Sequence, residues 1–178
     1  MILDTVFWIQ VGQPKILVGH QEPAQDLSAA LQAIFPMETE DLSIAWNQAF
    51  IKVSYKYDLG VLIDSLLPFL TNLATEPSGA ELVSLGSNTF HADWDVSWDA
   101  DRVSIHASWY SVVGDIDWVR DRCRRLEMSR IDFLAEWKMP LFVLRSSITD
   151  SGITLADASD LPKLDRILSR ISTWGRLY

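Results

Sequence analysis

Two histidines and two aspartates gather between residues 89 and 110, and they form the densest polar cluster in the chain. They are His91, Asp93, Asp95 and His106. Imidazole nitrogen and carboxylate oxygen together suit Zn²⁺, Mn²⁺ or Fe²⁺, and an aspartate beside a histidine can also support general base catalysis. The spacing matches neither HxH nor HExxH. Three interpretations follow: a solvated sheet surface, a partner-binding surface, or a metal or catalytic site.

The other residues with catalytic potential favour structural roles. The single cysteine, Cys123, excludes an internal disulfide and a cysteine-based zinc site. It lies on the apolar side of a predicted helix between Arg122 and Arg124, which predicts a core thiol. His20 follows a glycine and is interpreted as a loop residue. There is no GxSxG motif and no phosphate-loop spacing of glycines, so we expect no cofactor.

The histidine and aspartate cluster lies on a predicted β-hairpin in which apolar and polar side chains alternate. Residues 99–102 form its turn. A register that aligns Trp98 with Val103 pairs every apolar residue with another, whereas a slip by one residue would set Trp98 against Arg102. The apolar pairs are Trp98 with Val103, Val96 with Ile105, Trp94 with Ala107 and Ala92 with Trp109. The polar pairs are Asp95 with His106, Asp93 with Ser108 and His91 with Tyr110.

The residues before this hairpin predict further strands and two helices. Strands are predicted at 5–11 and 15–19, joined through Gly12-Gln13-Pro14, and a helix is predicted at 23–35. A second hairpin about Asn47-Gln48 should pair Ile44 with Ile51 and Leu42 with Val53. A leucine-rich helix over 59–73 should begin at Asp58 as N-cap and bend or break at Pro68. A short strand at 81–85 precedes the central hairpin.

The last third of the chain is predicted to be helical. Asp115 is a candidate N-cap for a helix that carries Ile116, Val119, Cys123 and Leu126 at heptad-like spacing. Ser129 with Asp132 forms a capping box before a longer helix, which Pro140 should bend or split and Ser151-Gly152 should end. A final amphipathic helix runs from about Leu161 to Trp174.

These elements predict an α+β fold in one domain over residues 1–178, with a sheet-rich part (1–112) and a helical part (113–178). We expect an antiparallel sheet of hairpins with about five to seven strands and helices packed on one face.

The composition constrains the partners. A formal net charge of −9 disfavours nucleic acid and favours either solubility alone or a basic partner. No apolar run approaches the roughly 20 residues that a membrane span needs, and the N-terminal residues lack the basic region of a signal peptide. We therefore expect a cytoplasmic protein with no membrane partner.

One cluster of basic residues stands out in this acidic chain. Arg120, Arg122, Arg124, Arg125 and Arg130 should cover much of one predicted helix, with Asp117, Asp121 and Glu127 within ion-pair reach. The favoured interpretation is a solvated, internally paired surface. The alternative is self-association, in which this cluster contacts the acidic hairpin of a second copy to form a homodimer.

The acidic residues concentrate in or just after the central hairpin, among tryptophans. Carboxylates with aromatic anchors suit a cationic protein surface, because charge accelerates association and aromatic burial slows release. The predicted partner-binding residues are Asp93, Asp95, Trp98, Asp99, Asp101 and His106, with Trp98 included on the condition that it is not fully buried.

The segment FHADWDVSWDADRVSIHASWY, in a chain of this size and charge, resembles bacterial immunity proteins of the polymorphic-toxin or contact-dependent growth inhibition type. The resemblance implies a small, acidic, cytosolic α+β protein that is not an enzyme and that neutralises a cognate toxin. A nuclease with a basic cleft is the expected toxin. The alternatives are a metal-dependent enzyme that uses His91, Asp93, Asp95 and His106, and a self-associating structural protein.

Overall fold

Two antiparallel sheets and a group of helices make up the fold in the computed structural model, which describes residues 6–19, 22–37 and 40–172. The strands of the first sheet, in spatial order, are β1 (Phe7–Gln10), β2 (Leu42–Trp46) and β3 (Ala49–Val53). Those of the second are β4 (Gly79–Gly86), β5 (Phe90–Trp98), β6 (Arg102–Val112) and β7 (Arg125–Ser129). The helices are α1 (Leu27–Ile34), the π-helix η1 (Tyr55–Leu59), α2 (Gly60–Thr75), α3 (Ile116–Arg122), α4 (Arg130–Ser151) and α5 (Asp160–Arg170). The α+β prediction is confirmed, but the strands form two sheets in place of the single sheet expected.

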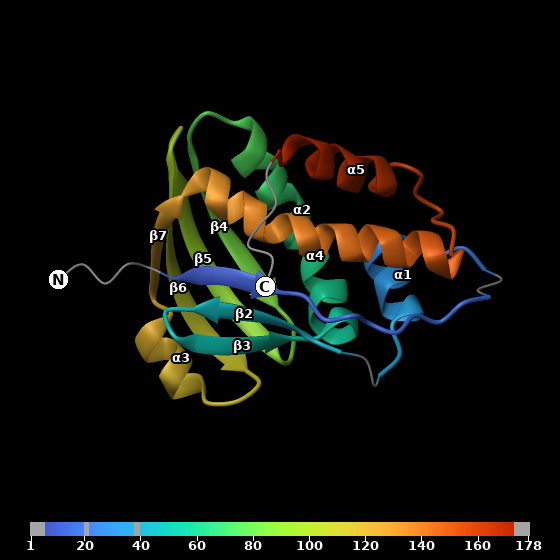
Figure 1. The fold of residues 1–178 in the computed structure, drawn as a ribbon, viewed down its shortest axis with the longest axis horizontal. Coiled ribbons are helices and arrows are strands. Elements are labelled where there is room, and N and C mark those ends of the chain that lie inside the picture. Colours follow the sequence, from blue (N-terminus) through green and yellow to red (C-terminus); the bar gives the residue numbers. More distant parts are fainter. Residues whose placement is uncertain (1–5, 20–21, 38–39, 173–178) are drawn as a thin grey trace.

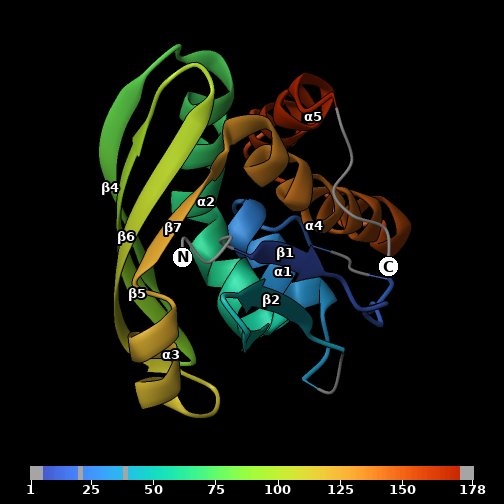
Figure 2. The same cartoon turned by 60° about the vertical axis from the view of Figure 1, so that its left-hand side comes forward.

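The four-stranded sheet has one covered and one open side. Helices α2 and α4 and the three-stranded sheet lie along the same side, which we call the inner face (Figures 1 and 2). On the opposite side, the outer face, no described helix or strand covers the sheet in Figure 2. Helix α5 packs on α2 and α4, farther from the sheet. The fold therefore leaves one broad sheet surface available.

The hairpin of the three-stranded sheet has the predicted register. Ile44 lies opposite Ile51, and Leu42 lies opposite Val53. Asn47 and Gln48 have φ values of 46° and 74°, and positive values at both central residues identify the type I′ turn that suits a two-residue hairpin.

The predicted strand at 15–19 is wrong. This segment has no strand structure, and the Leu17 N–H donates to the Ile34 carbonyl at the end of α1 (2.7 Å). Strand β1 pairs instead with β2, with Trp8 opposite Ala45. The predicted contributions of Thr5 and His20 lie outside the described residues.

The central hairpin also follows the predicted register over most of its length. Asp95 lies opposite His106 and Asp93 opposite Ser108, and all four apolar pairs form as expected. A β-bulge between His91 and Ala92 places His91 opposite Ser111, so the predicted pairing with Tyr110 is wrong. Strand β4 adds to the other side of β5, with Leu82 opposite Asp95.

Asp58 was predicted to be the N-cap of α2, and this prediction is wrong. The chain enters the helix through η1, where the Ser54 hydroxyl accepts from Tyr57 N (3.2 Å). Asp58 is only 1% exposed, and its carboxylate accepts from Ser54 N (2.8 Å), Thr89 Oγ1 (2.6 Å) and Ser87 Oγ. Asp58 therefore connects the start of α2 to the β4–β5 turn through hydrogen bonds. Helix α2 then continues through Pro68 without a break.

The predicted long helix after Asp115 is wrong beyond Arg122. Asp115 does cap α3, accepting from the N–H groups of Asp117 and Trp118, but the helix ends at Arg122. Residues 125–129 then form β7, in which Leu126 points into the core opposite Ile105. The part of the chain expected to be helical therefore supplies the fourth strand of the sheet.

The remaining helices match the sequence pattern more closely. Ser129 is the N-cap of α4, and its hydroxyl accepts from Asp132 N (3.4 Å). Helix α4 passes Pro140 unsplit and ends at Gly152, which has a left-handed φ of 73°. Trp174 of the predicted last helix lies outside the described residues. Over the described residues, no helix is both long and apolar enough to cross a membrane.

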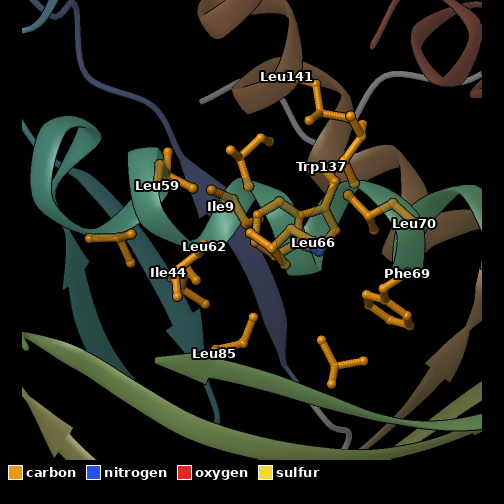
Figure 3. Close-up of a cluster of buried hydrophobic side chains, with 14 of the residues drawn as sticks. Ile9, Ile44, Leu59, Leu62, Leu66, Phe69, Leu70, Leu85, Trp137 and Leu141 are labelled. Carbon is orange, nitrogen blue, oxygen red and sulfur yellow. The ribbon is translucent and has the colours of Figure 1, made fainter. Parts of the chain in front are cut away.

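One hydrophobic core connects both sheets and the helices. Leucines of α2 lie between the two sheets and face Trp137 and Leu141 of α4 (Figure 3). Trp46 of β2 lies edge-on to Trp94 and Trp109 of the other sheet, with ring centroids 5.8 Å from each. The Trp46 indole N–H also donates to the Arg125 carbonyl at the start of β7 (3.1 Å). These contacts fix the four-stranded sheet against the rest of the fold and leave its outer face unused by the core.

Candidate functional site

The outer face of the four-stranded sheet carries most of the residues singled out from the sequence. Alternate residues of β4 to β7 point outward because side chains alternate along a strand. The outer face consists of Ala80, Leu82 and Ser84 of β4, His91, Asp93, Asp95 and Ser97 of β5, Ser104, His106, Ser108 and Tyr110 of β6, and Arg125 and Glu127 of β7. This surface is predominantly polar, and Leu82 and Tyr110 are its large exposed apolar side chains.

The geometry does not assemble His91, Asp93, Asp95 and His106 into a metal site. Within the described residues, no group of three or more His, Cys, Asp or Glu side chains is placed to hold a metal ion. His91 and Asp93 both contact Tyr110, whereas Asp95 and His106 lie opposite each other on β5 and β6.

Asp93 is held by hydrogen bonds from both neighbouring strands. Ser84 Oγ donates to Asp93 Oδ1 (2.8 Å), and Tyr110 OH donates to Asp93 Oδ2 (3.0 Å). The bond to Asp93 and the negative charge of that carboxylate raise the pKa of the Tyr110 hydroxyl. The His91 ring lies against Tyr110, with centroids 4.7 Å apart. Asp93 therefore helps to order the outer face.

Asp95 and His106 lie in a shallow polar pocket of about 260 Å³. The sheet register aligns Asp95, His106 and Arg125 in one row across β5, β6 and β7. Ser97, Ser104 and Glu127 form the next row and complete the polar lining. Among the described residues, no side chain forms a hydrogen bond or ion pair with the Asp95 carboxylate. The pocket thus presents an unpaired carboxylate beside an imidazole, a guanidinium and two hydroxyls.

The two aspartates of the β5–β6 turn differ in their roles. Asp99 Oδ1 accepts from Asp101 N (2.9 Å) and Arg102 N (2.8 Å), and these two bonds lower the pKa of Asp99. Arg130 donates to the Asp99 carbonyl (3.0 Å) from the start of α4. The Asp101 side chain, in contrast, is exposed at the tip of the turn. Asp99 therefore stabilises the turn, and Asp101 leaves its carboxylate available.

Trp98 does not belong to the outer face. Its side chain is only 8% exposed, and its indole N–H donates to the Glu76 carbonyl (3.3 Å). A Cβ atom at Gly79 would lie 2.3 Å from the Trp98 ring, so the ring packs directly over that glycine. Trp98 was included among the partner-binding residues on the condition that it is not fully buried, and the structure does not meet that condition. Its predicted place among the apolar residues of the hairpin is confirmed.

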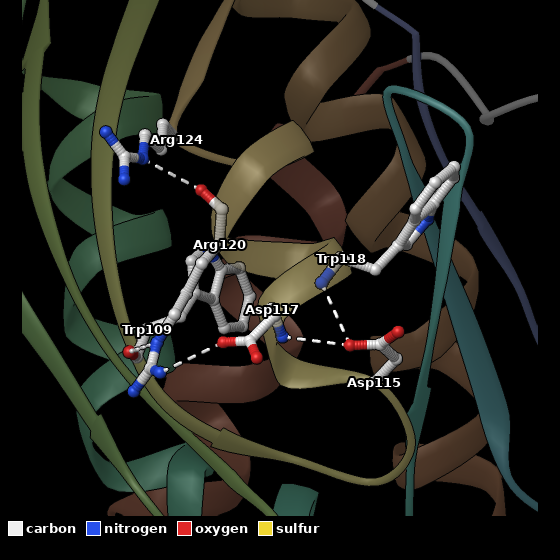
Figure 4. Close-up of polar contacts among 6 residues, drawn as sticks. All are labelled: Trp109, Asp115, Asp117, Trp118, Arg120 and Arg124. Atoms are coloured by element: carbon white, nitrogen blue, oxygen red, sulfur yellow. Dashed lines mark hydrogen bonds and ion pairs between the residues drawn. The ribbon is translucent and has the colours of Figure 1, made fainter.

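The arginines expected on one helix are distributed over several elements. Arg120 and Arg122 lie on α3, Arg125 on β7 and Arg130 on α4. Arg120 Nε donates to the Trp109 carbonyl (3.0 Å) and its Nη1 contacts Asp117 (3.4 Å), while Arg124 donates to the Arg120 carbonyl (Figure 4). The predicted pairing with Asp117 is confirmed. The continuous basic helix that the self-association hypothesis requires is not present.

Cys123 is a core thiol, as predicted. It is fully buried, and its Sγ donates to the Trp46 carbonyl (3.3 Å). Burial raises the pKa of this thiol to about 12, which keeps it protonated near neutral pH.

Sequence reasoning missed Leu82, Arg125 and Glu127 as members of the outer face. For β7 the sequence signal was weak, because RLEMS offers only one buried position between charged residues and follows a helix directly. For β4 the alternation in ELVSL was visible, but the sequence did not show which strand β4 pairs with. Aligning Leu82 with Asp95 requires the register of β4 on β5.

The comparisons with known proteins are all negative. No family model, no curated protein and no solved structure matches this chain. The functional argument therefore rests on the outer face itself.

Proposed function

We propose that this chain is a cytosolic immunity protein that binds and neutralises a cognate protein toxin, and that the outer face of the four-stranded sheet is its binding surface. The expected toxin is a nuclease domain with a basic cleft. Binding would place the polar pocket around Asp95 and His106 against that cleft, so that the substrate cannot enter.

The observation that carries this proposal is the unpaired Asp95 carboxylate in an open pocket. A carboxylate gains most from a charged donor supplied by a partner when no intramolecular donor already satisfies it. Asp93 and Asp99 already accept two hydrogen bonds each, so they offer less. Within the proposed site we therefore expect Asp95 to contribute most to partner binding, with smaller contributions from Asp101 and His106.

The charge of the whole chain supports a basic partner. With a formal net charge of −9, the protein attracts cationic surfaces over a distance that ionic strength limits. The outer face itself is mixed, because Arg125 and Arg102 lie near Glu127 and the Arg102–Glu127 pair is 3.6 Å long and exposed. We expect the net charge to set the rate of encounter and the pocket to set the orientation of the bound partner.

Co-expression with the protein encoded immediately upstream is the test of this function. If that protein is toxic when expressed alone, this chain should restore growth and co-purify with it. Association should weaken at high salt because charge attraction contributes to it. A toxic neighbour that is neither neutralised nor bound, or a neighbour that is harmless, would contradict the proposal.

A further inference from the structure

Strand β4 is an edge strand whose outward backbone groups have no partner. The Ser87 N–H donates to the Phe90 carbonyl (3.1 Å), which sets the hydrogen-bonding parity of the β4–β5 pair. In this parity the N–H and C=O groups of Ala80, Leu82 and Ser84 point away from β5. Within the described residues, no hydrogen bond reaches these groups. They form a regular row of donors and acceptors along the edge.

The free edge of β1 is capped, unlike that of β4. The Ile9 N–H points away from β2 and donates to the Glu136 carboxylate of α4 (3.0 Å). Glu136 is buried, so this contact takes the edge out of solvent. An incoming strand cannot reach this backbone.

The edges of β3 and β7 carry charged side chains. Lys52 lies on the β3 edge, and Arg125 and Glu127 lie on the β7 edge. The Arg125 carbonyl also accepts from the Trp46 indole N–H and from Asn47 Nδ2 (3.2 Å). Charged residues on edge strands are a common device that prevents unwanted pairing.

The β4 edge has none of these protections. Its outward side chains are those of Ala80, Leu82 and Ser84, with no lysine, no proline and no charge, and Leu82 is 66% exposed. The one charged residue of the strand, Glu81, points to the inner side, where Asn72 Nδ2 donates to it (3.1 Å). A neutral edge with a central exposed leucine is typical of a strand that pairs with another chain.

We propose that β4 pairs with β4 of a second copy of this chain, antiparallel and about a two-fold axis at Leu82. The pairing would join the two four-stranded sheets into one continuous eight-stranded sheet. This inference does not depend on the toxin-binding proposal, because it uses the backbone edge of β4 and leaves the Asp95 pocket open.

The side chains on this edge are complementary to themselves. With the axis at Leu82, the two leucines face each other on the outer side, and Ala80 lies opposite Ser84 of the second copy on both flanks. The three outward backbone pairs coincide with hydrogen-bonded positions of an antiparallel ladder. On the outer side of this pairing, no charged side chain of β4 is opposed. A second copy is therefore a better match for this edge than a strand of strongly basic character.

Sedimentation equilibrium of the purified chain with two matched variants tests the proposal. Leu82→Lys places two ammonium groups opposite each other at the axis, whereas Phe50→Lys changes an equally exposed apolar residue (66%) on β3. The wild type and Phe50→Lys should dimerise, and Leu82→Lys should be monomeric with an unchanged circular dichroism spectrum. Raising the salt concentration should favour the dimer by screening two chains of like charge.

A second variant covers the case in which Leu82→Lys does not fold. Ala80→Pro removes one outward N–H at an edge position, where proline is tolerated, and should weaken the dimer without changing any side chain that the core uses. Amide hydrogen exchange adds a direct readout. When nine-tenths of the chains are dimeric, exchange at Ala80, Leu82 and Ser84 should slow by about tenfold.

Two results would overturn the proposal. One is a wild-type chain that stays monomeric up to about 1 mM, a concentration at which half the chains would still be paired if the Kd were millimolar. The other is a dimer that persists in both Leu82→Lys and Ala80→Pro with fast exchange at the β4 amides, since that dimer would use another surface.

Discussion

The two faces of the four-stranded sheet are made by the same strands but are constrained in different ways. On the inner face, Trp94 and Trp109 are buried and lie edge-on to Trp46 of the other sheet. On the outer face, Asp95, which follows Trp94 directly, and His106, which lies opposite Asp95, contact solvent. Strand alternation thus separates the residues that hold the fold together from residues that are free to contact a partner. The predictions below test that separation, from the largest expected effect to the smallest.

The largest effect is expected from the centre of the inner face. Trp94→Ala should lower the free energy of unfolding by about 3–5 kcal/mol, because it removes a fully buried ring and leaves a cavity. Urea denaturation measures this change. Trp118→Ala is the control on α3, where the indole is 44% exposed and lies under Arg122; we expect a loss of only about 0.5–1 kcal/mol. Equal losses would contradict the assignment of Trp94 to the core.

Substitution of a buried polar residue should lower the free energy of unfolding nearly as much, because the loss depends on the burial of the side chain and not on its being apolar. Asp58→Ala would leave Ser54 N–H and the hydroxyls of Ser87 and Thr89 without their shared acceptor. We expect a loss of about 3 kcal/mol in the free energy of unfolding. Asp101→Ala, at the exposed tip of the turn, should change it by less than about 0.5 kcal/mol. If Asp58→Ala leaves the free energy of unfolding unchanged, the hydrogen bonds to Asp58 do not hold α2 against the sheet.

The outer face should tolerate charge reversal without loss of stability. Asp95→Lys should alter the free energy of unfolding by no more than about 0.5 kcal/mol, since no described side chain pairs with that carboxylate. Thermal melting with circular dichroism provides the measurement. A drop as large as that of Trp94→Ala would mean that Asp95 is a structural residue and not a recognition residue.

The smallest effect is expected at Tyr110 and should appear only at high pH. The raised pKa of Tyr110 in the folded state means that the protonated hydroxyl is stabilised there. This contribution is complete below the ordinary tyrosine pKa of about 10 and is lost as the pH rises through the higher folded-state pKa. Relative to Tyr110→Phe, the wild type should therefore lose stability in urea unfolding as the pH rises through that range. If both proteins show the same pH dependence, the hydrogen bond from Tyr110 to Asp93 does not contribute to stability.

The sequence predicted the parts of this fold in which the local pattern is strict. Alternation in residues 92–109 determined the hairpin register, because any slip would expose Trp98 or bury Arg102. It did not reveal the bulge at His91, since an extra residue near a strand end breaks no apolar pair. The β2–β3 hairpin was equally predictable from its apolar pairs.

The errors occurred where long-range contacts override a weak local pattern. Leu126 fits a helix spacing after Val119 and Cys123, but its partner is Ile105 in a strand 21 residues earlier. Asp58 has the sequence position of an N-cap and is instead drawn inward by Ser87 and Thr89. The candidate site was predicted in part, because β5 and β6 carry their own alternation. The contributions of β4 and β7 depend on pairings that single-strand patterns do not encode.

Binding kinetics with the upstream-encoded protein test the central claim that the outer face recognises a partner. The comparison uses the wild type, Asp95→Lys and Asp150→Lys, which makes the same charge change at an exposed position on α4. We predict that Asp95→Lys slows association about tenfold and also accelerates dissociation, while Asp150→Lys alters only the association rate and by much less. If both variants bind alike, the outer face is not the binding surface.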